Sequence, residues 1–307
     1  MGKTEEKKAR LLALMEEYGR QDVCLAFSGG VDSSLLLKLA ADSAAAHGTT
    51  VYAVTFDSRL HPACDLENAK KVAAELGGVH VVVTVDELEM EEIRSNPPDR
   101  CYLCKKQLFG KLLEFAAEKQ ISLTMEGTNE DDLHVYRPGI RAVRELGVKS
   151  PLAEAGLTKA EVKALAAEYG ISAASRPSTP CMATRLPYGA ELSYEVLKQI
   201  EEGEAVLREL IGGNVRLRLH GDVARIETDG ENLEKAVGSL TVTQTVTGTA
   251  GGQAQKFTFT VTVAGLPDGT YGDMTFQNGT ASFTLRHGES KTASGLPSGA
   301  AYEVTIA

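Results

Sequence analysis

The segment Ser28–Ser34 constrains this chain more than any other, because two glycines stand among serines between an apolar run and a helix-forming run. The run 23–27 predicts a buried strand, and the stretch 33–46 predicts a helix. Glycines let the backbone approach an anion closely, and the helix N-terminus offers free N–H groups. The segment therefore predicts a phosphate-binding loop, made by Ser28, Gly29, Gly30, Asp32, Ser33 and Ser34. The alternative is a plain strand–turn–helix connection.

Strands and helices are expected to alternate through the first part of the chain. Apolar runs at 51–56, 79–85 and 121–125 predict further strands. Helical spacing of apolar residues at 66–76 and 108–115 predicts helices between them. Strands that alternate with helices of this length form a parallel sheet with both faces covered. The expected fold class of this part is α/β.

Three local signals follow the predicted sheet. Thr158 and Glu161 have the spacing of a capping box at a helix start. Residues 171–190 hold three prolines and little periodicity, which predicts an exposed functional loop. Residues 214–227 predict a hairpin, and together with the helix before it they indicate a small α+β lobe.

Net charge and hydropathy exclude several classes of protein. The 307 residues include 32 basic and 42 acidic ones, a formal net charge of −10. An acidic chain is a poor general binder of nucleic acid, because neutralising phosphates needs clustered Lys and Arg. No apolar run approaches the length of a membrane span, and Met1–Arg10 is too charged for a signal peptide. We expect a cytoplasmic protein without a membrane or nucleic-acid partner.

Beyond residue 238 the chain changes character. Residues 239–307 contain three basic and four acidic residues, and all five cysteines precede them. Runs of alternating Thr and apolar residues stand between the Gly-Leu-Pro turns at 265–269 and 295–299. Short β-branched strands between such turns predict a small all-β sandwich. The predicted domains are 1–188, 189–238 and 239–307.

Three of the cysteines form the second candidate site. Cys101 and Cys104 are separated by two residues, and Cys181 lies between Arg176 and Arg185. An odd number of cysteines with one close pair suits reduced thiols, a metal site or catalysis better than disulfides. Three thiolates without a fourth ligand leave one metal position open, and flanking arginines favour a reactive thiolate. The alternative is an incidental pair of buried thiols.

Two polar clusters are weaker candidates. Glu126 and Asn129 follow a predicted strand, where the carboxyl ends of parallel strands bind ligands; the alternative is a polar surface turn. Arg216 and Arg218 alternate along a predicted strand, so they share one face that suits a phosphate or carboxylate. A solvated strand face is the alternative there. Asp32 either holds magnesium or orients the phosphate loop.

These motifs carry a resemblance to a known family. The glycine-rich loop resembles the PP-loop of ATP-dependent adenylating enzymes, and the first three quarters of the chain resemble the LarE family of sulfur transferases. The resemblance is carried by the collinear segments 28–34, 96–105, 126–132, 136–139, 150–159, 176–189 and 215–227. It implies a PP-loop fold, Rossmann-like and of the adenine nucleotide alpha hydrolase-like superfamily.

The resemblance also implies a reaction. ATP and Mg²⁺ would serve to adenylate a carboxylate of pyridinium-3,5-biscarboxylic acid mononucleotide, and sulfur would then replace the AMP oxygen. In one branch of the family the cysteine matched by Cys181 gives up its own sulfur, and no cluster is needed. In another, three cysteines hold a 4Fe–4S cluster, and the presence of Cys101 and Cys104 favours this version. Cys181 and Asp32 are the implied catalytic residues.

Substrate binding falls to a further set under this resemblance. The residues are Glu126, Asn129, Arg176, Arg185, Arg216 and Arg218. The implied partner is a small nucleotide, and the family tends to form homo-oligomers. Alternatives are another PP-loop enzyme, for tRNA thiolation or amide formation, and a non-catalytic chimera whose tail is the functional module.

The tail resembles a different family. Residues 239–307 are similar to Cna B-type repeats of bacterial surface proteins, which implies a β-sandwich. Residues 189–238 then form a C-terminal lobe of the enzyme part that is shorter than the lobe of the family.

Overall fold

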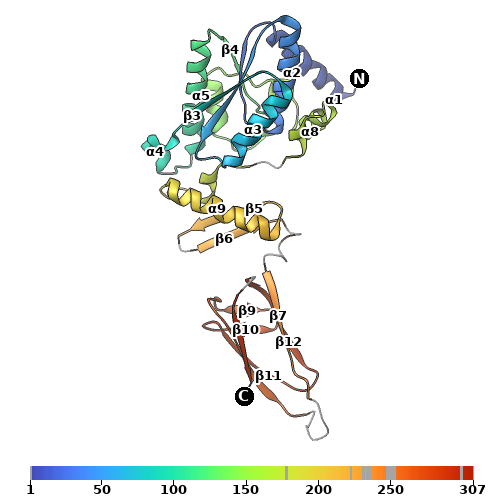
Figure 1. Ribbon diagram of the computed structural model, residues 1–307, viewed down its shortest axis with the longest axis vertical. Helices are drawn as coiled ribbons and strands as arrows, with labels where there is room; N and C mark the ends of the chain where they lie inside the picture. The colour runs from blue at the N-terminus through green and yellow to red at the C-terminus, as the bar shows by residue number, and fades with distance from the viewer. Residues whose placement is uncertain are drawn as a thin grey trace. The chain divides into compact units, whose positions relative to one another are not determined.

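The computed structural model describes residues 2–176, 179–221, 223–229, 232, 237–246, 254–297 and 300–306 (Figure 1). It contains two compact units, Met1–Glu201 with Arg218–Ala224, and Glu202–Leu217 with Arg225–Ala307. The division into domains at residues 188 and 238 stays a prediction.

The first unit is an α/β fold, as predicted. Its strands are β1 (Val23–Ala26), β2 (Val51–Ser58), β3 (Val79–Val85) and β4 (Leu123–Met125). Its α-helices before α9 are α1 (Lys3–Tyr18), α2 (Val31–His47), α3 (Ala63–Leu76), α4 (Glu91–Arg94), α5 (Arg100–Glu118), α6 (Gly139–Glu145), α7 (Pro151–Glu154) and α8 (Lys159–Glu168). Short 3-10 helices are η1 (Glu87–Glu89), η2 (Asp131–His134), η3 (Ser172–Ser175) and η4 (Met182–Arg185).

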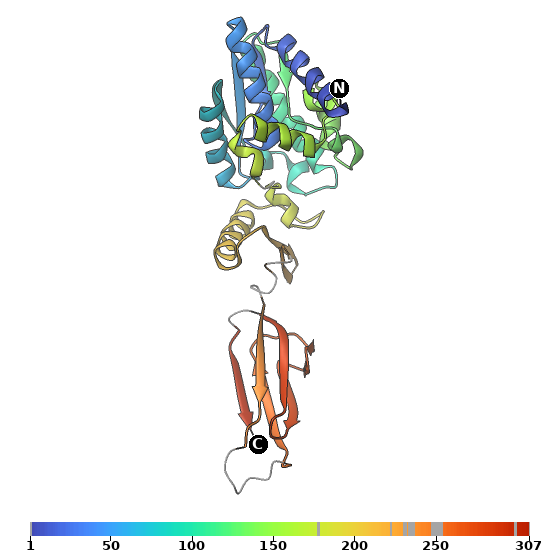
Figure 2. The same cartoon turned by 90° about the vertical axis from the view of Figure 1, so that its right-hand side faces the viewer.

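The four strands form one parallel sheet in the order β3-β2-β1-β4 (Figures 1 and 2). Leu25 in β1 lies opposite Ala53 in β2 and Met125 in β4, and all three are fully buried. Because every strand runs the same way, the carboxyl ends of β1, β2 and β4 meet at one edge of the sheet. That edge carries the glycine-rich loop after β1 and Glu126 after β4.

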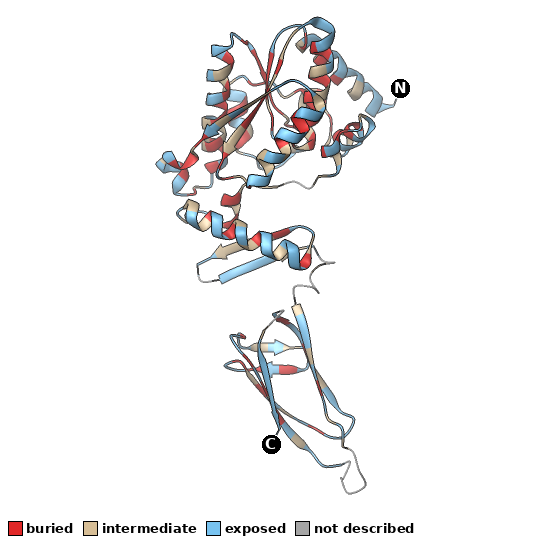
Figure 3. Cartoon of the chain, in the orientation of Figure 1, coloured by how far each residue is buried: buried red, intermediate tan, exposed pale blue. Residues whose placement is uncertain are grey.

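Helix α2 provides much of the core of this unit. It packs against α1, α3 and α8, and Leu35, Leu36 and Leu37 are completely buried. Figure 3 shows the buried residues concentrated in the sheet and on the helix faces that meet it. Burying three successive leucines is possible only where a helix is covered on several sides, so the hydrophobic effect fixes α2 firmly. Its N-terminus is thereby held directly after β1.

The capping box at the start of α8 is confirmed. Thr158 Oγ1 accepts a hydrogen bond from Glu161 N at 3.3 Å, and Glu161 Oε2 accepts one from Thr158 N at 2.9 Å. Lys7 Nζ forms an ion pair with Glu161 Oε2 at 2.7 Å, which joins α1 to α8. Burial alone raises the pKa of Glu161, but the hydrogen bonds from Lys7, Thr158 and Thr4 outweigh it and lower the pKa to about 2.

We expect Glu161→Gln to lower the free energy of unfolding of this unit by about 1 kcal/mol at pH 7, the usual worth of a helix cap. The folded pKa is about 2 against an ordinary 4.5, so the carboxylate stabilises above pH 4.5 and loses that contribution as the pH falls toward 2. Urea titrations between pH 7 and pH 3 should show the difference shrinking. Glu168→Gln, at the exposed end of the same helix, is the control and should change nothing measurable. A difference that is constant with pH would contradict this role for the carboxylate.

The prediction of an exposed loop over residues 171–190 is wrong in part. Met182, Ala183 and Arg185 in η4 are 2% exposed or less. Met182 N donates to the Leu60 carbonyl at 2.8 Å, which ties this segment to the end of β2. The apolar side chains of this segment pack into the core, although their spacing in the sequence is neither that of a helix nor that of a strand. Pro177 and Ser178 lie outside the described residues.

Helix α9 (Tyr194–Ile211) and the two-stranded sheet of β5 (Val215–His220) and β6 (Val223–Thr228) confirm the predicted helix and hairpin. Ser193 Oγ accepts a hydrogen bond from Val196 N at 3.4 Å at the start of α9. Leu217 N donates to the buried Glu204 carboxylate at 2.9 Å, so the hairpin is fixed to the helix by a charged hydrogen bond.

The C-terminal part is all-β, as predicted. Its strands are β7 (Val237–Thr243), β8 (Phe257–Val263), β9 (Gly269–Tyr271), β10 (Met274–Phe276), β11 (Thr280–Leu285), β12 (Ser290–Pro297) and β13 (Tyr302–Ile306). They pair antiparallel as β11-β8-β13, β12-β7 and β10-β9. Val261, Phe276 and Ala293 are fully buried between them. The Thr-rich alternation thus places Val and Phe inside and Thr outside.

Candidate active site

The glycine-rich loop lies between β1 and α2, where the sequence placed it. Gly29 has φ +68°, and a Cβ there would stand 2.7 Å from the Ala69 Cα and 2.8 Å from the Asn68 amide. Asn68 Nδ2 donates to the Gly29 carbonyl at 2.9 Å, and Ser33 Oγ donates to the Gly30 carbonyl at 3.1 Å. The loop is therefore wrapped tightly over the first turn of α2. Ser28 N donates to Ser33 Oγ and Gly30 N to Ser28 Oγ, both at 3.3 Å, and a bound anion would replace these weak hydrogen bonds.

We expect Gly29→Ala to slow ATP-dependent adenylation by about tenfold or more, because strain of 1–3 kcal/mol would be added to the loop that holds the phosphates. Gly48, at the other end of α2, is a matched control: it has φ +72° and open space around its Cα. Gly48→Ala should cost stability only. Pyrophosphate release assays on both variants measure the difference, and equal rates in the two would show that the loop tolerates a side chain.

Asp32 in the first turn of α2 is the charged centre of the phosphate-binding end. Its carboxylate forms an ion pair with Lys159 Nζ and accepts a hydrogen bond from Asn129 Nδ2 at 3.2 Å. Lys159 N in turn donates to Asp131 Oδ2 at 2.8 Å. Asp32 is thus held between the loop after β4 and the start of α8. Lys159 was missed in the sequence because nothing local connects it with residue 32.

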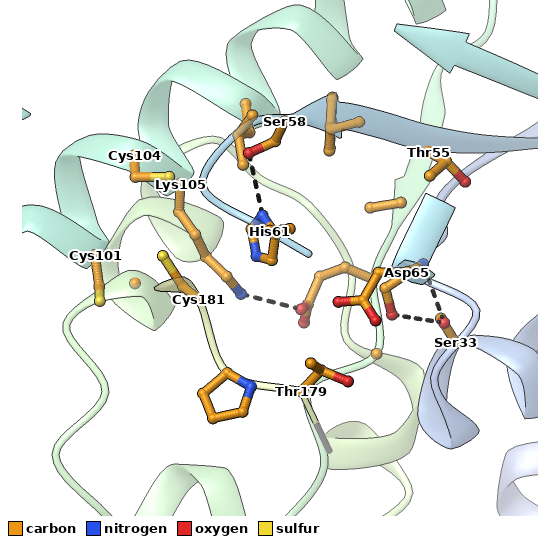
Figure 4. A pocket seen from close by; sticks show the side chains of 18 of the residues that line it. Ser33, Thr55, Ser58, His61, Asp65, Cys101, Cys104, Lys105, Thr179 and Cys181 are labelled. Atoms are coloured by element: carbon orange, nitrogen blue, oxygen red, sulfur yellow. Dashed lines mark hydrogen bonds and ion pairs between the residues drawn. The ribbon is translucent and has the colours of Figure 1, made fainter. Parts of the chain in front are cut away.

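A cavity of about 800 Å³ opens beside this loop (Figure 4). Its volume is in the range of sites that enclose a nucleotide-sized ligand. Of the candidate site residues, it is lined by Ser28, Asp32, Ser33, Cys101, Cys104, Glu126 and Cys181. The phosphate loop and the three cysteines, separated by up to 153 positions in sequence, therefore share one cavity.

The three cysteines reach the cavity from two elements. Cys101 and Cys104 occupy the first turn of α5, and Cys181 immediately precedes η4 (Figure 4). Cys101 is exposed, Cys104 is buried and Cys181 is half-buried. No other cysteine among the described residues lines the cavity. Because Cys101 and Cys104 stand at positions i and i+3 of a helix, their thiols lie on one side of α5.

Arg100 places a positive charge beside these thiols, and no sequence pattern pointed to this residue. Its guanidinium is buried, bonds to Asn96 Oδ1 and donates to Cys101 Sγ at 3.6 Å. Burial raises the pKa of Cys181, and Arg100 opposes that rise. Burial also raises the pKa of Cys104. The expected lowering by Arg176 and Arg185 is therefore wrong: the net shift is upward, and the opposing cation is Arg100.

The thiols suit a cluster better than a single ion. Among the described residues no three His, Cys, Asp or Glu side chains stand close enough to hold one metal ion. A 4Fe–4S cluster takes each thiolate on a different iron, so its ligands spread over a wider space. Three cysteines around one cavity, with the buried cation of Arg100 beside them, match the negative charge of such a cluster.

Glu126 lies at the end of β4 and is only 5% exposed. Its Oε1 accepts hydrogen bonds from Thr128 N at 2.9 Å and from Ser150 Oγ at 2.6 Å. Its Oε2 is 3.5 Å from Lys105 Nζ, which also lines the cavity and lies over the ring of Phe109. Lys105 follows Cys104 directly, but no local pattern distinguishes it from the other lysines of α5.

Several predicted binding residues instead anchor the segment that carries Cys181. Arg176 Nη2 pairs with Asp65 at 2.5 Å, and Arg185 Nη1 donates to the Pro180 carbonyl at 3.2 Å. Arg218 Nη1 donates to the Thr184 carbonyl at 2.5 Å. The predicted site residues of the first unit that do not line the cavity are Gly29, Gly30, Ser34, Asn129, Arg176, Arg185 and Arg218. Arg216 lies on β5, in the second unit.

A phosphate loop at the carboxyl end of a parallel sheet, opening into a nucleotide-sized cavity, defines an ATP-binding PP-loop fold. A family model described as PP-loop domain matches residues 3–98. The chain is 35% identical over 240 residues to the uncharacterized protein slr1717 of Synechocystis, covering 78% of this chain and 88% of that one. It is 37% identical over 221 residues to pyridinium-3,5-bisthiocarboxylic acid mononucleotide synthase of Lactiplantibacillus plantarum, covering 72% and 79% of the two.

The chain belongs to the LarE family of ATP-dependent sulfur transferases. Its tail has a separate relationship: residues 238–305 match a domain of unknown function, DUF7601. A stretch of 92 residues is 36% identical to the pilus tip adhesin Cpa of Streptococcus pyogenes, covering 27% of this chain and 14% of the adhesin. The similarity to a surface-protein module expected from the sequence is thus found, over a small part of that protein. Among the described residues, the helices are too short or too polar to cross a membrane.

Proposed function

We propose that this enzyme adenylates the carboxylates of pyridinium-3,5-biscarboxylic acid mononucleotide and converts them to thiocarboxylates, a step in nickel-pincer nucleotide cofactor synthesis. The observation that carries the proposal is the shared cavity, because one wall holds a phosphate loop and another holds three thiols. An acyl-adenylate made at the first wall is then within the same enclosure as the sulfur. Membership of the LarE family supports the same substrate.

In the first half-reaction, ATP is the co-substrate. The loop from Ser28 to Gly30 and the N-terminus of α2 bind its phosphates, and Asp32, which forms an ion pair with Lys159 in this structure, would hold the Mg²⁺ that accompanies ATP. The substrate carboxylate attacks the α-phosphorus, an O–P bond forms, and pyrophosphate leaves with the electron pair. Lys159, released from Asp32, is placed to balance the negative charge that develops on the phosphates.

Substrate recognition is assigned to the polar residues around the cavity. Glu126 and Lys105 present a charge pair toward the bound nucleotide, and Asn129 holds the loop after β4. Arg176, Arg185 and Arg218 keep the Cys181 segment in place. The substrate is small and anionic, so local cations are enough in a chain of net charge −10.

For the second half-reaction, Cys101, Cys104 and Cys181 would hold a 4Fe–4S cluster. When bound, such a cluster supplies an open iron that carries the sulfur to be transferred. Arg100 balances the charge of the three thiolates, and the buried side of the cavity excludes water from the adenylate. The other route uses the sulfur of Cys181 itself and leaves dehydroalanine at that position.

Anaerobic purification, iron analysis and visible absorption distinguish the two routes. We expect about four irons per chain, from the composition of the cluster, and loss of both iron and absorption in Cys101→Ser. Cys64→Ser is the matched control, because Cys64 is exposed and does not line the cavity. Active, iron-free protein whose mass falls by the elements of H₂S after turnover would establish the Cys181 route instead.

The overall function is tested by ATP-to-AMP turnover with candidate acceptors. We expect AMP and pyrophosphate with the pyridinium dicarboxylate mononucleotide, and none with tRNA or with ammonia donors. A folded protein that makes no AMP with the mononucleotide would defeat the proposal. A truncated chain ending before residue 238 is a useful further arm, because equal turnover would show that the β module is not needed for catalysis.

A further inference from the structure

A buried chain of three side chains ends at the wall of the cavity and is not used by the mechanism above. Ser58 closes β2, His61 follows three residues later, and Glu87 begins η1. Ser58 Oγ donates to Glu87 Oε1, and His61 Nδ1 lies 3.1 Å from Ser58 Oγ. Both Ser58 and His61 line the cavity (Figure 4), while Glu87 behind them is completely buried.

Hydrogen-bond counting fixes the tautomer of His61. Ser58 has one hydroxyl proton, and while Glu87 is ionised before the reaction, its carboxylate receives that proton. Ser58 Oγ also accepts from Leu60 N at 3.2 Å, so its contact with His61 can only be a second accepted bond. His61 must then carry its proton on Nδ1, which leaves the lone pair of Nε2 free to accept a proton.

His61 is also a neighbour of the sulfur-bearing segment. The Leu60 carbonyl accepts a hydrogen bond from Met182 N at 2.8 Å, so His61 and Cys181 flank one backbone hydrogen bond. Both side chains line the same cavity (Figure 4). The ring of His61 and the sulfur of Cys181 therefore border the space where the adenylate would be attacked.

We propose that His61 accepts the proton of the incoming sulfur during transfer, and that Ser58 and Glu87 position it for that task. This rests on the proposed function. A sulfur that carries a proton, as the Cys181 thiol or as hydrosulfide, bonds to the acyl carbon of the adenylate. The C–O bond to AMP breaks, and its electron pair leaves with AMP. The proton moves to His61 Nε2, the Nδ1 proton moves to Ser58, and the Ser58 proton moves to Glu87.

The surroundings favour this direction of transfer. Burial and Arg100 lower the pKa of His61, with Asp65 opposing them, so the ring is neutral before the reaction and does not retain a charge afterwards. Burial, with Asp86 and Asp57, raises the pKa of Glu87 against the lowering by its hydrogen bond from Ser58. Glu87 Oε2 is buried and has no hydrogen-bond partner among the described residues, so a neutral carboxylic acid is well suited to that place.

Nitrogen NMR of the iron-free protein tests the positioning without any activity. We expect His61 with a protonated Nδ1 and an unprotonated Nε2, although the opposite tautomer is the usual one for a free imidazole. In Glu87→Gln the amide can donate to Ser58, which would then donate to Nδ1, so the tautomer should reverse. His61 protonated on Nε2 in the unmodified protein would overturn the proposal.

Single-turnover kinetics test the proton transfer. His61→Asn keeps a donor near the Nδ1 position but has no base, so we expect thiocarboxylate formation to slow by about 10²–10⁴-fold, the usual worth of a general base. Pyrophosphate release should stay within about twofold of the unmodified enzyme, since adenylation needs no such base. His61→Ala should regain part of the lost rate when imidazole is added. This expectation holds for both sulfur sources, the Cys181 thiol and protein that has been reconstituted with iron and sulfide.

His80→Asn is the matched control, because His80 also bonds to a hydroxyl, that of Thr55 at 2.8 Å, but does not line the cavity. It should leave sulfur transfer unchanged. An unchanged transfer rate in His61→Asn would overturn the proposal even if adenylation proceeds normally. If the unmodified enzyme makes no AMP, the proposed function fails instead, and the tautomer measurement still decides the positioning.

Discussion

Replacing Cys181 by alanine is expected to abolish thiocarboxylate formation while pyrophosphate is still released and the acyl-adenylate accumulates. Both routes need this sulfur, either as a cluster ligand or as the donor, whereas the phosphate loop is built from β1 and α2. The expected loss is complete within detection. The segment should keep its fold, because Met182 remains bonded to Leu60 and Arg185 to Pro180.

Cys24→Ala is the control for Cys181→Ala. Cys24 is completely buried in β1, and burial raises the pKa of its thiol, so it should be inert. We expect that variant to lose some stability and no sulfur transfer. The measurement is pyrophosphate release together with chromatographic separation of the acyl-adenylate and the thiocarboxylate in one reaction. Product from Cys181→Ala at the normal rate would show that Cys181 has no part in the transfer.

Replacing Asp32 by alanine is expected to abolish the first half-reaction. The carboxylate is positioned by Lys159 and Asn129 and lines the cavity next to Ser28. In the proposed mechanism the Mg²⁺ that accompanies ATP would lose its carboxylate ligand, and Lys159 would lose its ion-pair partner. We expect adenylation to fall by at least about 10³-fold, the usual scale for loss of metal-assisted charge stabilisation, and sulfur transfer to fail with it.

Asp42→Ala is the matched control, because Asp42 lies nearly three turns further along α2 in an exposed pair with Lys38. It should turn over ATP normally. Pyrophosphate release at several Mg²⁺ concentrations separates the roles of Asp32: an Asp32→Asn variant rescued by high Mg²⁺ has lost a metal ligand. Full activity of Asp32→Ala at ordinary Mg²⁺ would mean that the carboxylate only orients the loop.

Substitutions of different residues should therefore affect the two half-reactions separately. Asp32 variants should stop both products, Cys181 variants only the thiocarboxylate, and His61 variants should slow the thiocarboxylate alone. This ordering follows from where the groups lie: Asp32 is on the first turn of α2, while Cys181 and His61 flank a hydrogen bond at the end of β2.

The β module has its own core, and none of its described residues, 237–246, 254–297 and 300–306, lines the cavity. Val261 and Phe276 are buried within that core. The acidic charge and the cysteines belong to the chain before it. Average composition over the whole chain therefore conceals two parts with different chemistry.

Features that depend on near neighbours were predictable. The loop Ser28–Ser34, the capping box of Thr158 with Glu161 and the Thr-rich strands of the tail each need only a few consecutive residues to be specified. The pair Cys101 and Cys104 belongs to the same class, since one helical turn relates them. Their chemistry follows from local backbone geometry, which hydrophobic periodicity and glycine placement determine.

Other features came only from packing. Residues 171–190 read as exposed because no period marks them, yet Met182 and Ala183 fill the space beside the end of β2. Lys159 and Asp32 are paired over an interval of 127 residues, and Ser58 reaches Glu87 over 29. No local pattern can carry such pairings, because each depends on which segments the sheet order brings together.

The sequence by itself determined the chemical inventory of this protein: a phosphate loop, three cysteines, a parallel sheet and a separate β module. Tertiary structure alone decided that the loop and the cysteines share one cavity, that Arg100 is the cation beside Cys101, and that Ser58 and Glu87 are joined to His61 at the cavity wall. The physical reason is the parallel order β3-β2-β1-β4. It brings the carboxyl ends of distant strands to one edge, where burial and hydrogen bonding fix each side chain.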